Sequence, residues 1–184
     1  MCPIVSYTIY MFQLNESFTD TAVMSLRTGG VVASTKRPII NPNNLKIEGW
    51  YCTDIFSKKE LILLTKDIRD IVPQGFAVDD YDVLSEPEDL TRLKDILEIG
   101  FELIGKLVVT DSKRKVGKVS DYATDTMTFF IHKLYISQPV YKSFSGGQIS
   151  IDRSQIVEIS TQRIVVRDTD EKLSSQVTAL VGVR

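Results

Sequence analysis

Apolar residues recur two positions apart in several short runs, and this spacing predicts β-strands that turn one face inward. The clearest runs fall into two pairs separated by 88 residues: Leu61–Leu63 with Ile149–Ile151, and Phe76–Val78 with Ile164–Val166. In both copies an I-x-x-I pair stands between the runs, within Lys66–Ile71 and within Ser154–Ile159. That spacing favours a single helical turn that joins two strands. The pattern therefore predicts a mainly β protein with an internal repeat.

Two further blocks of sequence extend the repeat. Asn41–Ile47 matches Asp125–Ile131 at a shift of 84 residues, and Gly29–Val32 matches Gly105–Val108 at a shift of 76. Three blocks in the same order make duplication a better explanation than chance, and loop insertions account for the growing shift. Between the third block and the Asn41–Ile47 block, the first copy is eight residues shorter than the second copy (84 − 76). This leaves little room for the second strand of the first copy, so we expect a short strand at Pro38–Ile40.

One amphipathic helix is predicted between the two copies. Ser85 and Glu88 have the spacing of a capping box, and Gly100 is a suitable C-terminal stop. Four apolar residues share one helical face: Leu90, Leu93, Ile96 and Leu97. We expect this face to pack inward, and an intermolecular contact through it is the alternative. Residues 81–100 contain two basic and six acidic residues, so the linker is acidic.

The second copy resembles a PRC-barrel domain. Its matching segments follow the pattern "G-x-x-V … G-x-V-x-D … strand … I-x-x-I" and are Glu102–Val109, Val116–Tyr122, Phe130–Leu134 and Ile151–Ile159. The resemblance covers Phe101–Asp168 and extends more weakly to Ala22–Asp80 through the repeat. It implies a mainly β fold of two tandem small PRC-type β-barrels joined by one α-helix. The two barrels are expected to pack as a pseudo-symmetric pair.

This resemblance predicts five parts of the chain. They are an N-terminal extension at 1–21, a first PRC-barrel-like unit at 22–84, a linker helix at 85–100, a second unit at 101–168 and a C-terminal tail at 169–184. Both ends are expected to be peripheral. In the first unit, Trp50 is expected to be buried in the core.

The resemblance also implies a class of function. PRC-barrel domains occur in the H subunit of photosynthetic reaction centres, in the maturation factor for small-subunit ribosomal RNA and in archaeal division-associated proteins. Protein contact and scaffolding are common to them, and the family has no catalytic residues to carry over. We therefore expect a non-enzymatic adaptor or scaffold that binds another protein. A homo-oligomer is a further expectation, and a ribosome- or RNA-associated factor is the alternative.

The loop Ser137–Gly147 is a candidate for partner binding because it is an insertion relative to the first copy. The candidate residues are Tyr141, Lys142 and Phe144, since aromatic and basic side chains on a loop over a rigid scaffold suit recognition. In the alternative interpretation, Tyr141 and Phe144 cover the open end of the barrel.

A basic hairpin tip is the candidate site for RNA phosphates or an acidic protein patch. It consists of Lys113, Arg114, Lys115 and Lys118. Residues 101–168 contain ten basic and seven acidic residues, so positive charge gathers in the second unit. The simpler interpretation is a solvated turn, and no aromatic residues flank the tip as a stacking platform.

Catalytic and metal-binding patterns are not found. His132 is the only histidine and stands in a predicted strand, and no G-x-S-x-G motif accompanies it. The acidic run Asp79, Asp80 and Asp82 lacks the spacing of an EF-hand, so we expect a solvated linker. No cofactor or metal is predicted.

Cysteine usage and hydropathy predict a cytoplasmic protein without a membrane span. Cys2 and Cys52 are too few for a disulfide framework and are expected to be free thiols. No run of apolar residues approaches the roughly 20 that a transmembrane helix needs. The formal net charge of -2 excludes a uniformly basic nucleic-acid-binding protein.

Overall fold

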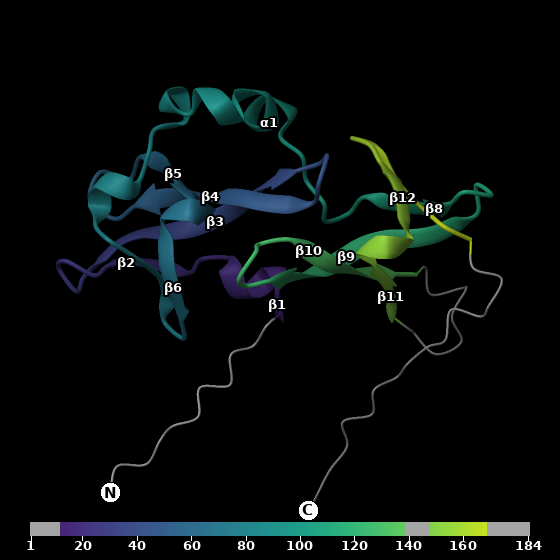
Figure 1. The fold of residues 1–184 in the computed structure, drawn as a ribbon, viewed down its shortest axis with the longest axis horizontal. Helices are drawn as coiled ribbons and strands as arrows, with labels where there is room; N and C mark the ends of the chain where they lie inside the picture. Colours follow the sequence, from purple (N-terminus) through teal and green to yellow (C-terminus); the bar gives the residue numbers. More distant parts are fainter. Residues whose placement is uncertain (1–11, 139–147, 169–184) are drawn as a thin grey trace, which may run out of the picture.

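The computed structural model describes residues 12–138 and 148–168. In these residues the protein is mainly β, with two separate sheets and one short α-helix, as the sequence predicts (Figure 1). The two sheets lie side by side along the long axis of the molecule, and α1 (Lys94–Ile99) lies over the first sheet.

The first sheet has six strands in the order β5-β4-β3-β2-β7-β6. The strands are β2 (Ala22–Ser25), β3 (Val31–Asn41), β4 (Lys46–Asp54), β5 (Glu60–Leu64), β6 (Ile68–Val72) and β7 (Gly75–Val78). A 3-10 turn, η2 (Thr65–Asp67), joins β5 to β6, so the predicted helical turn is confirmed but shorter than its I-x-x-I segment.

The second sheet has seven strands, of which six follow the order β11-β10-β9-β8-β13-β12. They are β8 (Leu107–Thr110), β9 (Lys115–Asp125), β10 (Ile131–Ser137), β11 (Gln148–Asp152), β12 (Ile156–Ile159) and β13 (Arg163–Val166). The turn η7 (Arg153–Gln155) joins β11 to β12. The seventh strand, β1 (Phe12–Leu14), comes from the N-terminal segment and pairs with β9.

The two sheets share one topology, in agreement with the internal repeat. In each unit the first and last strands are parallel neighbours, β2 with β7 and β8 with β13. The antiparallel registers also agree, because Thr35 faces Cys52 in the first sheet and Val119 faces Ile136 in the second, each 84 residues later. β-Bulges interrupt the ladders at equivalent places in both sheets.

The prediction for the start of the first unit is wrong. The strand expected at Pro38–Ile40 is β3, which has 11 residues and is as long as β9. Val31 and Val32 begin β3, so Gly29–Val32 is not the counterpart of Gly105–Val108. Gly29 and Gly105 misled the comparison because they belong to different turns. Gly29, at φ 70°, lies between β2 and β3, whereas Gly105, at φ 80°, precedes β8.

Residues 85–100 do not form the continuous helix that the sequence predicts. Only α1, with 6 residues, is α-helical, and three 3-10 turns precede it: η3 (Tyr81–Val83), η4 (Pro87–Asp89) and η5 (Thr91–Leu93). Ser85 caps no helix, because its N–H donates to Ile62 O at 3.0 Å and its carbonyl oxygen accepts from Ile62 N–H at 2.8 Å. Gly100 does end α1, in the left-handed conformation at φ 55°.

The apolar face of this linker packs inward, as expected. Its four side chains, Leu90, Leu93, Ile96 and Leu97, contact one face of the first sheet. That face presents Ile39, Tyr51, Ile62 and Leu64. Burial against the sheet therefore holds a segment that is too short to be a stable helix alone.

Residues 12–21 of the N-terminal segment belong to the fold, although the sequence predicts this segment to be peripheral. β1 adds to the edge of β9, with Leu14 opposite Ala123. The next residue, Asn15, contacts the same strand, because its Oδ1 accepts a hydrogen bond of 2.6 Å from the Tyr122 hydroxyl. Phe18 is only 2% exposed and lies in the core of the first unit. The segment therefore connects the two units.

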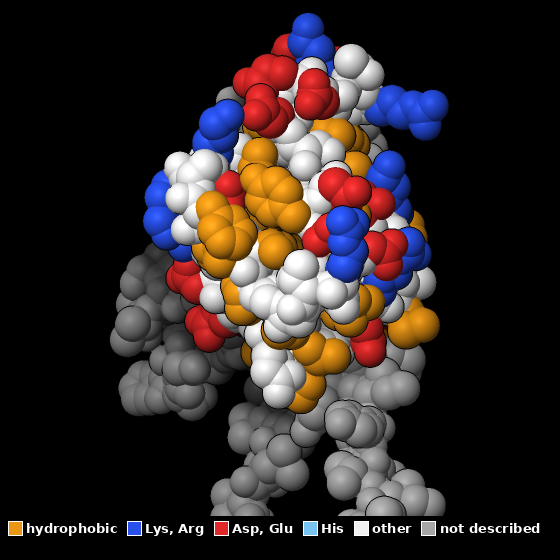
Figure 2. Space-filling model, turned by 90° about the vertical axis from the view of Figure 1, so that its left-hand side faces the viewer, with side chains coloured by type: hydrophobic (Ala, Val, Ile, Leu, Met, Phe, Trp, Pro, Cys, Tyr) orange, Lys and Arg blue, Asp and Glu red, His pale blue; other side chains and the backbone are white. Residues whose placement is uncertain are grey.

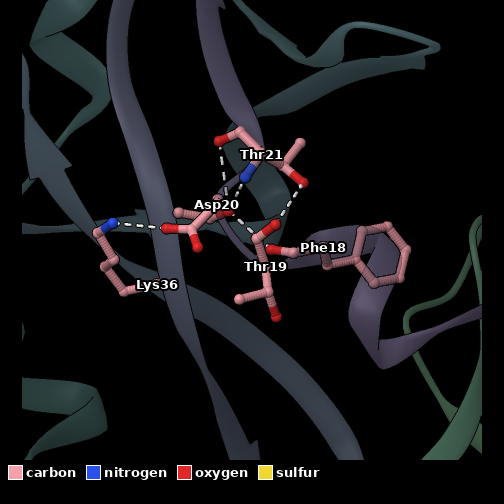
Figure 3. A network of polar contacts seen from close by, with 6 residues as sticks. Phe18, Thr19, Asp20, Thr21 and Lys36 are labelled. Atoms are coloured by element: carbon pink, nitrogen blue, oxygen red, sulfur yellow. Dashed lines mark hydrogen bonds and ion pairs between the residues drawn. The ribbon is translucent and has the colours of Figure 1, made fainter.

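After Phe18, a turn fastened to β3 leads into β2 (Figure 3). The buried Thr35 hydroxyl donates to Phe18 O at 2.7 Å and accepts from Thr21 N–H at 2.9 Å. Asp20 is left-handed at φ 54°, and its carboxylate lies 2.6 Å from Lys36 Nζ. The two bonds of Thr35 satisfy a hydroxyl that is fully buried, where an unpaired polar group would destabilise the fold.

Two hairpin tips bind each other reciprocally at the junction of the units. Ile47 N–H donates to Phe129 O at 2.9 Å, and Ile131 N–H donates to Leu45 O at 2.9 Å. Leu45 and Phe129 are both buried and both left-handed, at φ 51° and 59°. Leu45 and Phe129 are equivalent positions 84 residues apart, as are Ile47 and Ile131, so the contact has pseudo-twofold symmetry.

One hydrophobic cluster runs through both units. Trp50, which the sequence places in the core, is fully buried at its centre. Its ring lies 5.4 Å from Phe18, 4.8 Å from Phe76 and 5.6 Å from Phe129. Because Phe129 belongs to the second unit, the two units share the packing around this ring.

Candidate functional site

The first unit ends in a cluster of exposed apolar side chains, which we call the distal patch. It consists of Leu26 and Val31 from the β2–β3 hairpin, Phe56 from the β4–β5 turn and Tyr81 from η3. The exposed fraction ranges from 39% for Tyr81 to 73% for Phe56. Figure 2 looks onto this end and shows hydrophobic side chains gathered in the middle of the face, with acidic side chains above them. Contiguous apolar patches of this kind are typical of interaction sites.

Asp54 holds two members of the distal patch in place. It is buried at the end of β4, where Oδ1 accepts from Phe56 N–H at 2.9 Å and Oδ2 accepts from the Tyr81 hydroxyl at 3.0 Å. The Ser57 hydroxyl and N–H also donate to Oδ2. These bonds, the Ser57 hydroxyl first, lower the pKa of Asp54 to about 2. The carboxylate therefore stays ionised at neutral pH.

The acidic run after β7 is exposed at Asp79 and Asp82, as expected for a solvated linker, but Asp79 and Asp80 are also held by ion pairs. Asp79 pairs with Arg69, and this bond lowers the pKa of Asp79. Asp80 accepts from the Ser25 hydroxyl at 2.9 Å and lies 2.9 Å from Arg27. The carboxylates of Asp79 and Asp80 thus have separate partners. Within residues 12–138 and 148–168, no group of three or more His, Cys, Asp or Glu side chains is placed to hold a metal ion.

The basic tip lies in the β8–β9 hairpin, and part of it has a structural partner. Arg114 lies 2.5 Å from Asp168, which is the counterpart of Asp80, so both units anchor the end of their last strand to a hairpin arginine. Lys113, Lys115 and Lys118 are exposed. Arg114 is exposed as well, so all four predicted cations face solvent, and the RNA contact stays a prediction.

The predicted partner-binding residues Tyr141, Lys142 and Phe144 lie outside the described residues. The flanking strands show what their loop corresponds to. It connects β10 to β11, as the loop with Phe56 connects β4 to β5. Ten residues separate Ser137 from its strand partner Gln148, against six between Thr53 and its partner Glu60, which agrees with the predicted insertion.

His132 and Cys52 lie in different sheets. His132 is exposed in β10, and its ring centre lies 5.4 Å from that of Phe12. Cys52 is buried and free in β4, and burial raises the pKa of its thiol to about 12. A thiol of this kind is protonated at neutral pH and therefore a poor nucleophile. Cys2 lies outside the described residues.

A cavity of about 170 Å³ lies between the two units, beside the C-terminal end of α1. Its apolar lining includes Ile39 and Ile40 of β3, Ile96 and Leu97 of α1, and Leu103. Arg37 and Tyr51 also line it, and the guanidinium carbon of Arg37 lies 4.0 Å from the centre of the Tyr51 ring.

Sequence patterns do not reveal this cavity. Its residues come from the N-terminal segment, β3, β4, α1, the segment after α1 and β9, so only the folded chain brings them together. The one local signal is Arg37, which with Lys36 forms the only charged pair in the sequence of β3.

No protein-family model matches this chain, and no curated protein is similar to it in sequence. Among the described residues, no helix has the length and apolar character to cross a membrane.

Proposed function

We propose that this chain is a non-enzymatic adaptor or scaffold that binds another protein through the loop ends of its two units. The distal patch is the observation that carries this proposal. Four apolar side chains are exposed together, and the buried Asp54 fixes the two aromatic ones among them. Rigid aromatic groups bind partners with a small entropy cost, because few rotamers are lost.

The loop of the second unit extends the same proposal. Tyr141, Lys142 and Phe144 belong to the counterpart of the loop that carries Phe56. Each unit thus places at least one aromatic residue in this connection. Loops that a rigid sheet presents are a common location for binding residues.

The finer fold that we propose is a tandem pair of PRC-type β-barrels, with the units and the linker divided as predicted. Identical strand orders and a parallel pair of first and last strands in each unit support it. In the described residues each sheet is open, because its outer strands, such as β5 and β6, are not paired with each other. The three-residue turn η2 joins β5 to β6, and side chains of both strands pack in the same hydrophobic cluster.

RNA or ribosome association through the basic tip is the alternative. The exposed Lys113, Lys115 and Lys118 favour it, whereas the ion pair with Asp168 partly neutralises the fourth cation, Arg114, which is exposed as well. Binding to phosphates releases counterions, so affinity for RNA would fall steeply with added salt.

Affinity capture from the source organism tests the proposal with matched variants. The double substitution Phe56→Ser and Tyr81→Ser removes the two aromatic side chains of the distal patch, and Tyr141→Ala with Phe144→Ala removes the aromatic residues of the second loop. Met127→Ser is the control, because Met127 is 77% exposed at a different hairpin tip. Each bait is used with and without nuclease and at low and high salt.

We expect one protein partner to survive nuclease and high salt, and to be lost with either loop-end double variant but not with Met127→Ser. Purified partner should then bind the wild type at least about tenfold more tightly than the double variants, a difference of about 1.4 kcal/mol. Equal capture by all baits would contradict the proposal. Ribosomal proteins that vanish with nuclease would instead support the alternative.

A further inference from the structure

The cavity at the junction of the units is lined by residues of both. Ile39 and Ile40 of β3 line it from the first unit, Leu97 lines it from α1, and Leu103 and Tyr122 line it from the second unit. Small-molecule sites occur preferentially at such interfaces between domains. No residue of the distal patch lines the cavity, so the proposed function leaves it unexplained.

The cavity has the size and polarity of one small apolar group. Its volume of about 170 Å³ is close to that of an apolar protein cavity of about 150 Å³ that binds benzene. Ile39, Ile96 and Leu97 supply branched aliphatic walls, which offer dispersion contacts. Ile39 and Ile40 are only 4% and 3% exposed, because α1 and residues 100–104 already lie against β3. The space therefore suits a small molecule and not an added peptide strand.

Three polar side chains of the lining have hydrogen-bond donors to offer a ligand. The guanidinium of Arg37 has five N–H donors, and none of them is paired with a described carboxylate. Asn15 uses its Oδ1 to accept from the Tyr122 hydroxyl at 2.6 Å, which leaves its Nδ2 without an acceptor among the described residues. The Tyr51 hydroxyl is the third donor. An anionic group on a ligand would accept from donors of this kind.

The charges around the cavity favour a carboxylate over an ammonium group. The guanidinium carbon of Arg37 lies 4.0 Å from the centre of the Tyr51 ring, and this contact restricts the cation while its planar fork stays available to a carboxylate. Glu102 is the one acidic side chain among the described residues that line the cavity. It is exposed on the segment after α1, where water solvates its charge. The better-positioned charge is therefore the cation.

We propose that the cavity binds a small apolar carboxylate, with an aryl or branched alkyl body. The apolar body lies among Ile39, Ile96 and Leu97, and the carboxylate pairs with Arg37. Because the bound molecule contacts residues of both units, its binding stabilises their junction. This site is separate from the distal patch and goes beyond the proposed function.

Phenylacetate is the probe, and its affinity for the full-length, isotope-labelled protein is measured from amide chemical shifts. Phenylacetamide has nearly the same shape without the charge, phenethylamine has the opposite charge, and acetate lacks the ring. The protein variants are Arg37→Gln, which removes the cation, and Leu97→Trp, which fills the cavity. Arg92→Gln is the control, because Arg92 is exposed on η5 and does not line the cavity.

We expect phenylacetate to bind the wild type and Arg92→Gln equally, and to bind Arg37→Gln about tenfold more weakly. The wild type should prefer phenylacetate to phenylacetamide by about the same factor. Arg37→Gln should bind these two compounds alike, which a misfolded variant would not do. The shift changes should include Ile39, Leu97 and Leu103. Leu97→Trp should bind neither compound, although its urea unfolding stays cooperative.

Several results would overturn the proposal. They are absence of phenylacetate binding, equal affinity of the wild type for phenylacetate and phenylacetamide, tighter binding of phenethylamine, and unchanged binding by folded Leu97→Trp. Acetate that binds as tightly as phenylacetate would show an adventitious ion only. Capture of a protein partner through the distal patch does not use Arg37, so the two proposals fail independently.

Discussion

Asp54 is a buried carboxylate whose four hydrogen bonds fix the geometry of the distal patch. Phe56 and Tyr81 are far apart in the sequence, and this one side chain brings them together. An exposed aromatic residue without such support would sample many orientations and pay an entropy cost on binding. The residue that supports the candidate site is thus hidden beneath it.

The pKa of Asp54 predicts how the stability of the protein changes with pH. The folded value of about 2 lies below the ordinary aspartate value of about 3.9 in an unfolded chain. The stabilising contribution is therefore fully present above about pH 4 and is lost as the pH falls toward 2. Asp54→Asn should be less stable than the wild type at pH 7, and urea unfolding should show this difference shrinking between pH 4 and pH 2.

Asp82→Asn is the control for this experiment, because Asp82 is exposed in the same region. Its unfolding midpoint should follow the wild type at each pH. If the free energy of unfolding changed with pH in parallel for the wild type and Asp54→Asn, Asp54 would not be the source of this pH dependence.

At the scale of elements, the segment before β2 completes the hydrophobic core of the first unit. Phe18 lies parallel to Phe76 with ring centres 5.5 Å apart and also contacts Trp50. Replacing it with alanine removes a fully buried ring, so Phe18→Ala should lower the free energy of unfolding by about 3–5 kcal/mol. Urea unfolding at neutral pH measures this loss.

Phe12→Ala on β1 is the matched control, since Phe12 is 46% exposed. We expect Phe12→Ala to lower the free energy of unfolding far less than Phe18→Ala, because a half-exposed ring buries little apolar area on folding. If Phe18→Ala lowered the free energy of unfolding as little as Phe12→Ala does, the segment would be peripheral after all.

The sequence predicts elements well where local pattern and fold agree. Alternating residues such as Leu61 and Leu63 face the core, so the strands and the turns at the hairpin tips follow from their spacing. Prediction fails where a distant contact overrides local preference. Ser85 has the sequence of a helix cap but pairs with Ile62, and β1 is a strand only because β9 offers an edge.

The candidate site is less predictable than the fold for the same reason. Aromatic residues in loops are visible in the sequence, but their grouping into the distal patch depends on Asp54 and on the hairpin geometry. The cavity depends on the way α1 packs on β3, and no local pattern records that contact.

At the scale of the whole molecule, the two units are expected to unfold together. They share one hydrophobic cluster, a reciprocal pair of backbone hydrogen bonds and the N-terminal connection through β1 and Phe18. Trp50 is the only tryptophan of the chain and lies in the first unit with Phe129 of the second unit against its ring, so its fluorescence reports the first unit and its junction with the second. A substitution confined to the second unit therefore tests the coupling.

Leu134 is the residue to change, because it is fully buried in β10 of the second unit. Leu134→Ala should lower the free energy of unfolding by about 2–5 kcal/mol. If the units are coupled, the unfolding transition seen by Trp50 fluorescence should move to lower urea and give the same loss of free energy. Far-UV circular dichroism should give the same single midpoint. Lys133→Ala is the control, since its ion pair with Asp152 is exposed and contributes little. An unmoved Trp50 transition beside an earlier second transition would show two independent domains, and the junction would then be a contact surface between them.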